Sequence, residues 1–332
     1  MPKILFIGDL HYSAKNAHQT DAVFAELSSL LNTKKHKIDS ICLLGDVFDK
    51  EKTESGVLNR VRSLLVMLTS HADVTVLVGN HDGKTNQLYL TNDHILVAVE
   101  DMDRVTVVSK PIVIQGVMYC PYVPAGRFVE ALETLGSAYL SVPLIAAHQE
   151  FANADFGTFI SKHGDEWPLT NPMVVSGHIH NYSRTQPNIL YVGTPYEVGF
   201  GEAGGKTVSI IDSATLEETR IAISVPRKIT INIDIKDIKT LKVPEDNNLY
   251  RITISGDEEK ILLFKKTKGY HKLNEKHKLI FKKSEHLQVR KNEQNLDFVS
   301  FLRKSVASES KAINNILERV LVRMSTEQSN AD

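Results

Sequence analysis

Short apolar runs alternate along the chain with longer segments in which apolar residues recur every three or four positions. The apolar runs predict strands at 3–8, 40–45, 74–79, 142–147 and 172–176. The segments with helical spacing lie near 19–32, 53–70, 86–99 and 127–135. Strands that alternate with helices in this way are typical of βα units on a largely parallel sheet.

Further apolar runs add strands to this picture. They lie at 104–109, 111–115, 117–122, 188–193, 206–212 and 217–224, with Gln115-Gly116 and Asp212-Ser213 as turns. Two sheets packed face to face and flanked by helices would use all of these strands. In α/β sheets, ligands gather beyond the carboxyl ends of the strands, so we expect a functional site at that edge.

The pattern changes near Val225. Alternating apolar residues predict a strand at 229–235, a second strand follows at 249–254, and a Lys-rich stretch comes next. These features predict a small α+β domain at about 228–292, and we divide the chain into parts at 1–226, 227–293 and 294–332.

The last part has apolar residues at helical spacing with charges between them. They are Phe298, Phe301, Leu302, Val306, Ile313, Ile316, Leu317, Val320 and Leu321. This segment is either a helix that docks on its own domain or a helix, or helical pair, that binds a partner.

Charge is distributed unevenly, although the net charge of the chain is −1. Residues 1–226 carry 17 Lys and Arg against 25 Asp and Glu, and residues 227–332 carry 22 against 15. The stretch 260–291 holds eleven basic and two acidic residues. It is either a solvated Lys-rich surface or a surface for a polyanion, and a basic part fused to an acidic one favours the polyanion.

Composition places the chain among globular proteins, with 332 residues of which 42% are hydrophobic and 24% charged. Cys42 and Cys120 both lie in strand-like runs, so we expect buried thiols rather than a disulfide, which fits a reducing compartment. No run approaches the roughly 18 apolar residues of a membrane span, and residues 1–7 read as a strand rather than a signal. We therefore expect a cytoplasmic, intracellular protein without membrane contact.

Polar residues follow strand-like runs in five places. The motifs are Gly8-Asp9-Leu10-His11, Gly45-Asp46, Gly79-Asn80-His81-Asp82, Ala147-His148 and Gly177-His178-Ile179-His180. Each motif alone is typical of a turn, or of a hydrogen-bonded core histidine in the case of His148. Together they indicate a cluster of hard oxygen and nitrogen ligands. Histidines without such a setting are expected at the surface, namely His18, His36, His71, His94 and His163.

The order of these motifs resembles the calcineurin-like metallophosphoesterase superfamily over about residues 3–212. The resemblance implies an α/β fold, a four-layer αββα sandwich, here with a small α+β capping domain and a C-terminal helical segment. It implies one metal site formed by Asp9, His11, Asp46 and His180, and a second formed by Asp46, Asn80, His148 and His178, with Asp46 as the bridge. It also implies that His81 contacts the phosphate and helps to protonate the leaving group, with Asp82 or Asp49 orienting or charge-balancing it.

Imidazole and carboxylate ligands without thiolates suit Mn, Fe or Zn better than Ca. We expect two divalent ions, with Mn²⁺ first and Mg²⁺ or another transition metal as alternatives. Two ions ~3.5–4 Å apart clamp a phosphoryl group and activate a water molecule.

Several features resemble the SbcD-type nuclease subunits, including compact phage-like forms. Gly45-Asp46-Val47-Phe48-Asp49 lacks the Arg-Gly of the Ser/Thr protein phosphatases, and Tyr191-Val192-Gly193-Thr194-Pro195 and Phe200-Gly201-Glu202 follow the last histidine motif. The resemblance implies an SbcC-type ABC ATPase with a coiled coil as partner, held by the C-terminal segment. It also implies a homodimer formed through the helices near 53–70 and 86–99.

The first hypothesis is a Mn-dependent DNA nuclease subunit in DNA repair and recombination, with 3′→5′ exonuclease activity on double-stranded DNA and endonuclease activity on single strands. The second is a phosphodiesterase or phosphatase for small molecules. An inactive scaffold ranks last, because every ligand position is filled. The loop 151–172, with Trp167, is either a structured surface loop or a segment that shapes substrate access.

Overall fold

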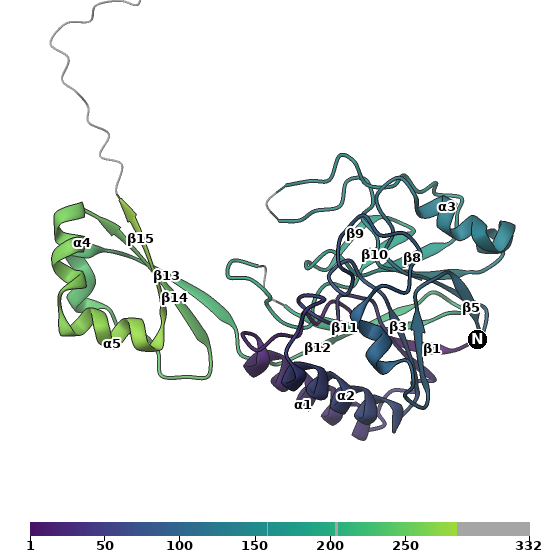
Figure 1. The fold of residues 1–332 in the computed structure, drawn as a ribbon, viewed down its shortest axis with the longest axis horizontal. Coiled ribbons are helices and arrows are strands. Elements are labelled where there is room, and N and C mark those ends of the chain that lie inside the picture. Colours follow the sequence, from purple (N-terminus) through teal and green to yellow (C-terminus); the bar gives the residue numbers. More distant parts are fainter. Residues whose placement is uncertain (158, 203–204, 284–332) are drawn as a thin grey trace, which may run out of the picture.

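The computed structural model describes residues 1–157, 159–202 and 205–283. These residues form two six-stranded sheets packed face to face and a separate three-stranded sheet (Figure 1). The predicted C-terminal helical segment at 294–332 lies outside the described residues, and so does the end of the predicted small domain.

The first sheet has the order β12-β11-β1-β2-β3-β4. Its strands are β1 (Lys3–Ile7), β2 (Ser40–Leu43), β3 (Asp73–Leu77), β4 (Val105–Val108), β11 (Thr207–Asp212) and β12 (Glu218–Ala222). Strands β1 to β4 run parallel, while β11 pairs antiparallel with both β1 and β12. The carboxyl ends of β1, β2 and β3 therefore meet at one edge.

The second sheet has the order β5-β6-β7-β8-β10-β9. Its strands are β5 (Ile112–Ile114), β6 (Val117–Cys120), β7 (Leu144–Ala147), β8 (Met173–Ser176), β9 (Ser183–Gln186) and β10 (Ile189–Tyr191). Strands β6, β7, β8 and β10 are parallel. Edge strand β9 is polar and was not predicted, because Ser183–Gln186 carries no apolar run.

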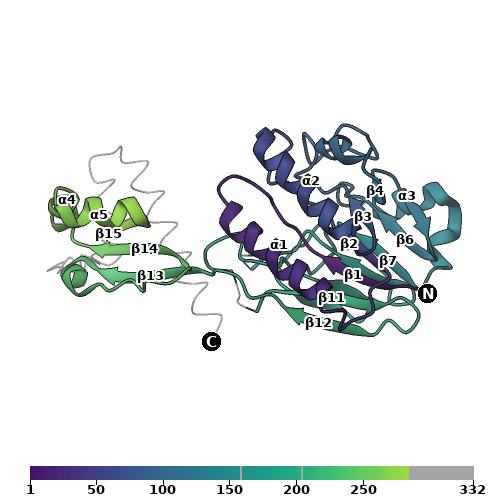
Figure 2. The ribbon, with the colours of Figure 1, turned by 90° about the horizontal axis from the view of Figure 1, so that it is seen from below.

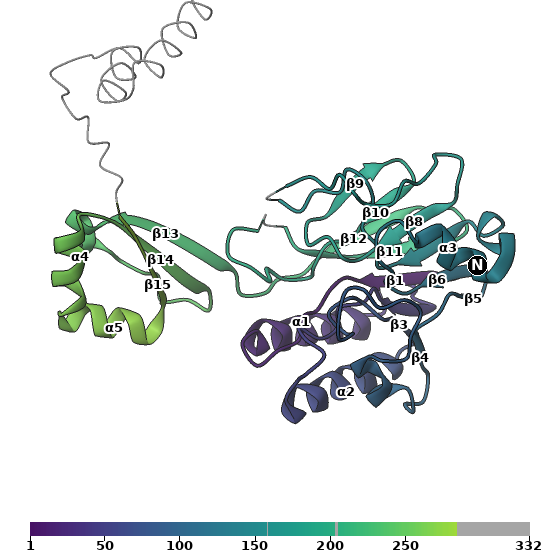
Figure 3. The same ribbon diagram turned by 45° about the horizontal axis from the view of Figure 1, so that its top comes forward.

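Three apolar layers hold the sandwich together. Helices α1 (Ala17–Asn32) and α2 (Ser55–Thr69) cover the outer face of the first sheet (Figures 2 and 3), where Leu5 of β1 is buried against them. The next residue, Phe6, points into the layer between the sheets, as the alternation of a strand requires. Helix α3 (Phe128–Leu132) packs on the outer face of the second sheet. The predicted four-layer αββα sandwich is confirmed.

The predicted helix over 86–99 is wrong, because only η1 (Ile95–Val99), a 3₁₀ helix, forms there. The Thr91 hydroxyl accepts a hydrogen bond from the Asp93 amide, and such local side-chain bonds compete with a helix. The chain then pairs Gly83 with His94 and buries the latter, contrary to the expected surface position. Neither ring nitrogen of His94 has a hydrogen-bond partner among the described residues.

The helix predicted at 127–135 is shorter in the structure and is followed by a 3₁₀ helix. Helix α3 ends at Leu132, and η2 (Glu133–Leu140) follows with a kink at Gly136, where φ is 64°. The base of the loop 151–172 belongs to the core, since Trp167 is buried and donates to the Pro172 carbonyl at 2.9 Å.

The third sheet, of three parallel strands, stands apart from the sandwich (Figure 1). Its strands are β13 (Lys228–Asp234), β14 (Leu249–Gly256) and β15 (Lys278–Lys283). The helices η3 (Ile235–Thr240), α4 (Glu258–Lys265) and α5 (Lys268–Lys276) connect these strands. Ile235, Ile252, Ile254 and Ile261 form its core. Asp257 caps α4 and Thr267 caps α5, which explains where these unpredicted helices begin.

The buried carboxylate of Glu197 joins this small α+β part to the sandwich. It accepts hydrogen bonds from the Arg227 guanidinium at 3.0 Å and from the Lys228 amide. The ammonium of Lys228 donates to the Val198 carbonyl at 2.6 Å. Residues 227–283 carry 15 Lys and Arg against 8 Asp and Glu, so this part is basic.

The two cysteines, Cys42 and Cys120, are buried and free, as the sequence predicts. In the part of the chain that the structure describes, no helix has the length and apolar character needed to cross a bilayer.

Candidate metal centre

The five polar motifs converge where parallel strands end. Asp9 and His11 follow β1, Asp46 follows β2, and Asn80 follows β3 in the first sheet. From the second sheet, His148 follows β7, and the motif containing His178 and His180 follows β8. The face-to-face packing of the sheets brings these ends together, so all seven expected ligands gather at one edge of the sandwich.

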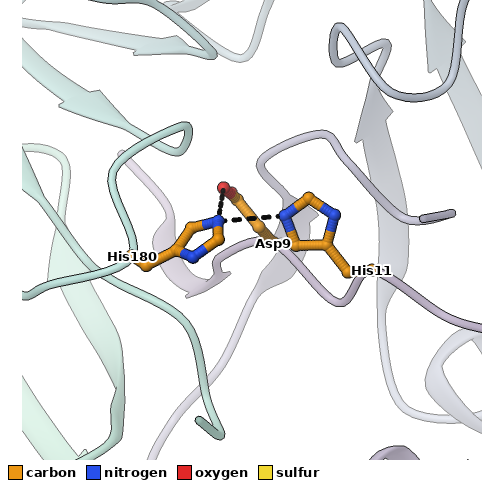
Figure 4. Close-up of side chains that lie close together, drawn as sticks. All are labelled: Asp9, His11 and His180. Atoms are coloured by element: carbon orange, nitrogen blue, oxygen red, sulfur yellow. Dashed lines mark hydrogen bonds and ion pairs between the residues drawn. The ribbon is translucent and has the colours of Figure 1, made fainter. Parts of the chain in front are cut away.

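One group consists of Asp9, His11 and His180, whose ligand atoms lie within 4.8 Å of one another (Figure 4). The Nε2 atoms of His11 and His180 are 3.0 Å apart. The His180 Nε2 atom also lies 4.0 Å from Asp9 Oδ2. Asp9 and His11 are buried, and His180 is half-buried.

A second group consists of Asp46, His148 and His178, again within 4.8 Å. The Asn80 side-chain oxygen lies 3.1 Å from His148 Nε2 and 3.0 Å from His178 Nδ1. The two ring nitrogens are 3.3 Å apart. This group therefore matches the expected second site, including its amide ligand.

The Asp46 carboxylate lies between the two groups. Its Oδ2 is 3.4 Å from His148 Nε2 and 3.8 Å from His11 Nε2. Burial raises the pKa of Asp46, but the nearby His148, His11 and His81 outweigh it, so the net pKa falls below the ordinary value. An ionised carboxylate in this place can bind a cation at each of the two groups.

The donors fit divalent metal ions. His148 Nδ1 donates to the Leu44 carbonyl at 2.6 Å, so Nε2 is left facing the oxygens of Asp46 and Asn80. The Nε2 atoms of His11 and His180 also face each other. Only one proton fits between them, so at least one of these nitrogens presents a lone pair. A cation at each group would receive these lone pairs, and hard oxygen and imidazole donors suit Mn²⁺, Fe²⁺ or Zn²⁺. This cluster is therefore the candidate metal site.

Backbone conformation fixes these positions. Asp46, His11 and His178 all have positive φ, at 47°, 42° and 80°, a region that side-chain-bearing residues rarely adopt. A Cβ on Gly79 would come within 2.2 Å of both the Asp46 amide nitrogen and Asp46 Oδ1. Glycine at 79 therefore allows the β3 end to approach the shared carboxylate.

The predicted acid, His81, lies at the solvent side of the cluster. Its Nδ1 is 2.8 Å from the Asp49 backbone carbonyl, which requires a donor, and its Nε2 faces Asp46 Oδ2 at 4.0 Å. Asp49 thus orients His81 through its main chain rather than through the expected carboxylate.

The Asp82 carboxylate has a different set of contacts from the one expected. It accepts from the amides of Phe48 at 3.0 Å and Gly79 at 2.9 Å and is fully buried. Burial and the charge of Asp46 raise the pKa of Asp82 to about 7. Asp82 therefore ties the β2 and β3 loops together rather than charge-balancing His81.

Two carboxylates were not predicted. Glu150 Oε2 lies 3.9 Å from His178 Nε2, and Glu202 Oε1 lies 3.4 Å from His180 Nδ1. Each approaches the ring nitrogen that faces away from the cluster, an arrangement that orients histidine ligands. Glu150 could have been found from its spacing, since residues two apart in an extended chain share a side and it follows His148 by two.

A pocket of about 510 Å³ opens beside His81. Lys50, Lys52 and Lys84 line it together with Asp49, Glu51 and Asn80, and the Lys84 ammonium pairs with Asp93 at 2.7 Å. Lys50 and Lys52 also line a neighbouring hollow of about 190 Å³, which extends to Lys15. Anionic groups that approach the cluster from this side meet the ammonium groups of Lys50 and Lys52, which both hollows share.

Paired sheets with imidazole and carboxylate groups gathered at one sheet edge define an α/β protein with a candidate two-metal site. The model of the calcineurin-like phosphoesterase family matches residues 2–182. The chain belongs to this family and is a phosphoesterase.

Two relatives are viral proteins. The chain is 34% identical over 286 residues to "Putative phosphoesterase 078R" of Invertebrate iridescent virus 3, covering 82% of this chain and 81% of the relative. It is 32% identical over 279 residues to "Putative phosphoesterase 244L" of Invertebrate iridescent virus 6, covering 80% and 98%.

Solved structures with a related arrangement include an archaeal phosphodiesterase and the nuclease MPE of Pseudomonas putida. The archaeal protein is 14% identical, with 66% of this chain and 98% of that chain covered and a TM-score of 0.34. The nuclease is 15% identical, with 66% and 87% covered and a TM-score of 0.33. Neither likeness adds to the assignment.

Proposed function

We propose that the protein is the nuclease subunit of an SbcCD-type complex, which hydrolyses DNA phosphodiesters with two divalent ions, Mn²⁺ first among them. The observation that carries this proposal is the lysine-lined pocket beside His81. A single small phosphate ester needs no lysines such as Lys50 and Lys52 beyond the metal ligands, whereas a nucleic acid strand offers a phosphate at every step.

The chemistry divides between the ions and the side chains. When bound, two divalent ions neutralise phosphate charge and make water more acidic. Asp9, His11, His180 and Asp46 would hold one ion, and Asp46, Asn80, His148 and His178 the other. The Asp49 carbonyl accepts a hydrogen bond from His81 Nδ1, so it is the imidazolium form that carries a second proton, on Nε2, to pass to the oxygen that leaves phosphorus.

The basic part at 227–283 supports a polyanionic substrate. Exposed lysines at 265, 266, 268, 272 and 276 lie on or beside α4 and α5. We assign this part the role of a capping and DNA-binding domain for double- and single-stranded DNA. Such contacts make affinity fall steeply with salt.

Two protein partners complete the proposal. Residues 294–332 would bind an SbcC-type ABC ATPase, and deleting the residues after Asn295 should abolish that association while nuclease activity remains. A homodimer would use the surface of α2 and η1, where Val66 is 60% exposed and Val97 is 48% exposed. Unchanged ATPase co-purification after the deletion would reject the first role.

The decisive experiment offers labelled duplex and single-stranded DNA to the protein with Mn²⁺, with His81→Ala as the comparison and salt as a variable. Cleavage that falls about 10²–10⁴-fold in His81→Ala, with binding that weakens as salt rises, supports the nuclease. Hydrolysis of bis-p-nitrophenyl phosphate without any DNA binding would reject it in favour of a small-molecule phosphodiesterase.

A further inference from the structure

Two aromatic rings contact His178 on its outer side, whereas lysines line the pocket beside His81. The Phe156 ring meets the His178 imidazole edge-on, with centroids 5.7 Å apart and planes at 89°. The Tyr122 ring lies 5.8 Å from the same imidazole and is tilted by 34°. A candidate metal ligand is thus bordered by two aromatic side chains.

Phe159 extends this group toward solvent. Its ring stacks on Phe156 with centroids 4.5 Å apart and planes at 11°, and the residue is 58% exposed. One face of the ring is covered by Phe156, so the exposed surface includes the opposite face. With the adjacent Ile160, which is 49% exposed, Phe159 presents continuous apolar surface near the candidate metal cluster, and such surface marks binding sites.

The backbone holds these rings in place. The Phe156 amide donates to the Phe159 carbonyl at 3.0 Å, and the Ser161 amide donates to the Ala154 carbonyl at 2.8 Å. Asp155 and Ile160 form an antiparallel bridge between them. Backbone hydrogen bonds therefore join the two segments that carry the stacked pair, residues 154–156 and 159–161.

We propose that Phe159, backed by Phe156, is a stacking platform for an unpaired nucleobase of the strand being cleaved. This inference rests on the proposed function and specifies its substrate. The Phe156 ring touches the His178 imidazole, where a phosphate of the substrate would bind. A ligand group that stacks on Phe159 must therefore be attached close to that phosphate. A nucleobase is the flat group that is tethered to each phosphodiester.

The two sides of the site would then bind different parts of the substrate. Phosphates that continue along the strand lie toward Lys50, Lys52 and Lys84, and a base lies on the aromatic side. A base within a duplex has both faces covered by its neighbours, so only an unpaired or extruded base can stack on Phe159. Single strands and frayed ends are therefore the preferred substrates.

The test pairs a change in the ring with a change in the base. Phe159→Ala, Phe159→Leu and Phe159→Trp are compared with wild type on a single-stranded oligonucleotide and on versions with one abasic residue at successive positions around the cleaved bond. Leu169→Ala is the matched control, because Leu169 is 67% exposed in the same loop without a ring contact to the cluster. Rates are resolved into kcat and KM.

We expect Phe159→Ala and Phe159→Leu to raise KM about 5- to 150-fold on the intact strand, which is the range for loss of one stacked base. One abasic position should abolish the difference between these variants and wild type, and Phe159→Trp should retain stacking. Equal KM for wild type, Phe159→Ala and Leu169→Ala on every strand would overturn the platform, as would full function of Phe159→Leu.

Failure of the platform can be separated from failure of the nuclease assignment. The indole of Phe159→Trp is exposed, whereas Trp167 is buried, so quenching of its fluorescence by a metal-free mixture with single-stranded DNA reports stacking without cleavage. DNA cleavage without quenching overturns the platform alone. Quenching without cleavage supports the platform and overturns the nuclease, and the absence of both overturns both.

Discussion

The Glu202 carboxylate lies 3.4 Å from Nδ1 of His180 and is itself held by the Lys206 ammonium at 2.8 Å. It also accepts from the Gly199 amide at 2.6 Å. Burial raises the pKa of Glu202, but His180 and Lys206 outweigh it and lower this pKa to about 2. A carboxylate that is ionised near neutral pH therefore fixes the ring whose other nitrogen faces His11.

Glu202→Gln should weaken metal binding at the His11 side, because the neutral amide no longer favours a proton on His180 Nδ1 and a free lone pair on Nε2. Loss of such a supporting carboxylate typically costs about 10- to 100-fold in metal affinity. Metal titration by calorimetry checks this, with the exposed Glu133→Gln as control. Identical affinities for Glu202→Gln and wild type would show that Glu202 only closes its own loop.

Asp49→Ala should leave turnover within about threefold of wild type. Because His81 is held by the main-chain carbonyl of residue 49, the contact survives removal of the carboxylate. Steady-state hydrolysis of a phosphodiester measures the effect, beside His81→Ala as the positive comparison. If Asp49→Ala lost as much turnover as His81→Ala, the carboxylate would have a role that the backbone contact does not explain.

Asp82→Asn should destabilise the fold by about 1–3 kcal/mol. Asparagine offers one accepting oxygen where two amides, those of Phe48 and Gly79, now bind separate oxygens, so one buried amide would face an NH₂ group. Urea unfolding of the metal-free protein measures the change. Equal unfolding midpoints for the variant and wild type would contradict the role of Asp82 as the link between the two loops.

Most of the sandwich could be predicted from the sequence because buried parallel strands are short, uniformly apolar and followed by polar motifs. β1, β2, β3, β7 and β8 all lie within a residue or two of their predicted ranges. The gathering of the ligands followed from the same rule about strand ends. The helix predicted at 86–99 did not form because side chains such as Thr85 and Thr91 accept hydrogen bonds from nearby backbone amides and hold the chain in a loop.

Contacts between segments far apart in the chain could not be predicted. Glu202 reaches His180 only because a loop returns after β10, and Phe159 is linked to His178 only through the ring of Phe156. Neither relation leaves a periodic pattern in the sequence. The contacts of Asp49 and Asp82 could not be predicted for a related reason, since spacing does not distinguish a carboxylate from the carbonyl beside it.

Metal binding should become tighter, and should stabilise the protein more, as pH rises from 6.5 to 9. In the metal-free protein burial disfavours a proton on His148, but Asp46 and Asp9 outweigh it and raise the pKa of His148 to about 9. The folded state therefore holds this proton more tightly than the unfolded state, so the stabilising contribution is complete below pH 6.5 and is lost as pH rises through 9.

A divalent ion competes with that proton for Nε2, so its binding should release the proton, and its apparent affinity should rise by up to about tenfold per pH unit in this range. Thermal melts of chelator-treated protein, with and without Mn²⁺ at several pH values, measure the effect, and proton release in weak buffer measures it independently. Asp46→Asn should remove most of the pH dependence together with the metal. A metal-induced rise in Tm that is the same at pH 6.5 and pH 8.5 would contradict the proposed competition at His148.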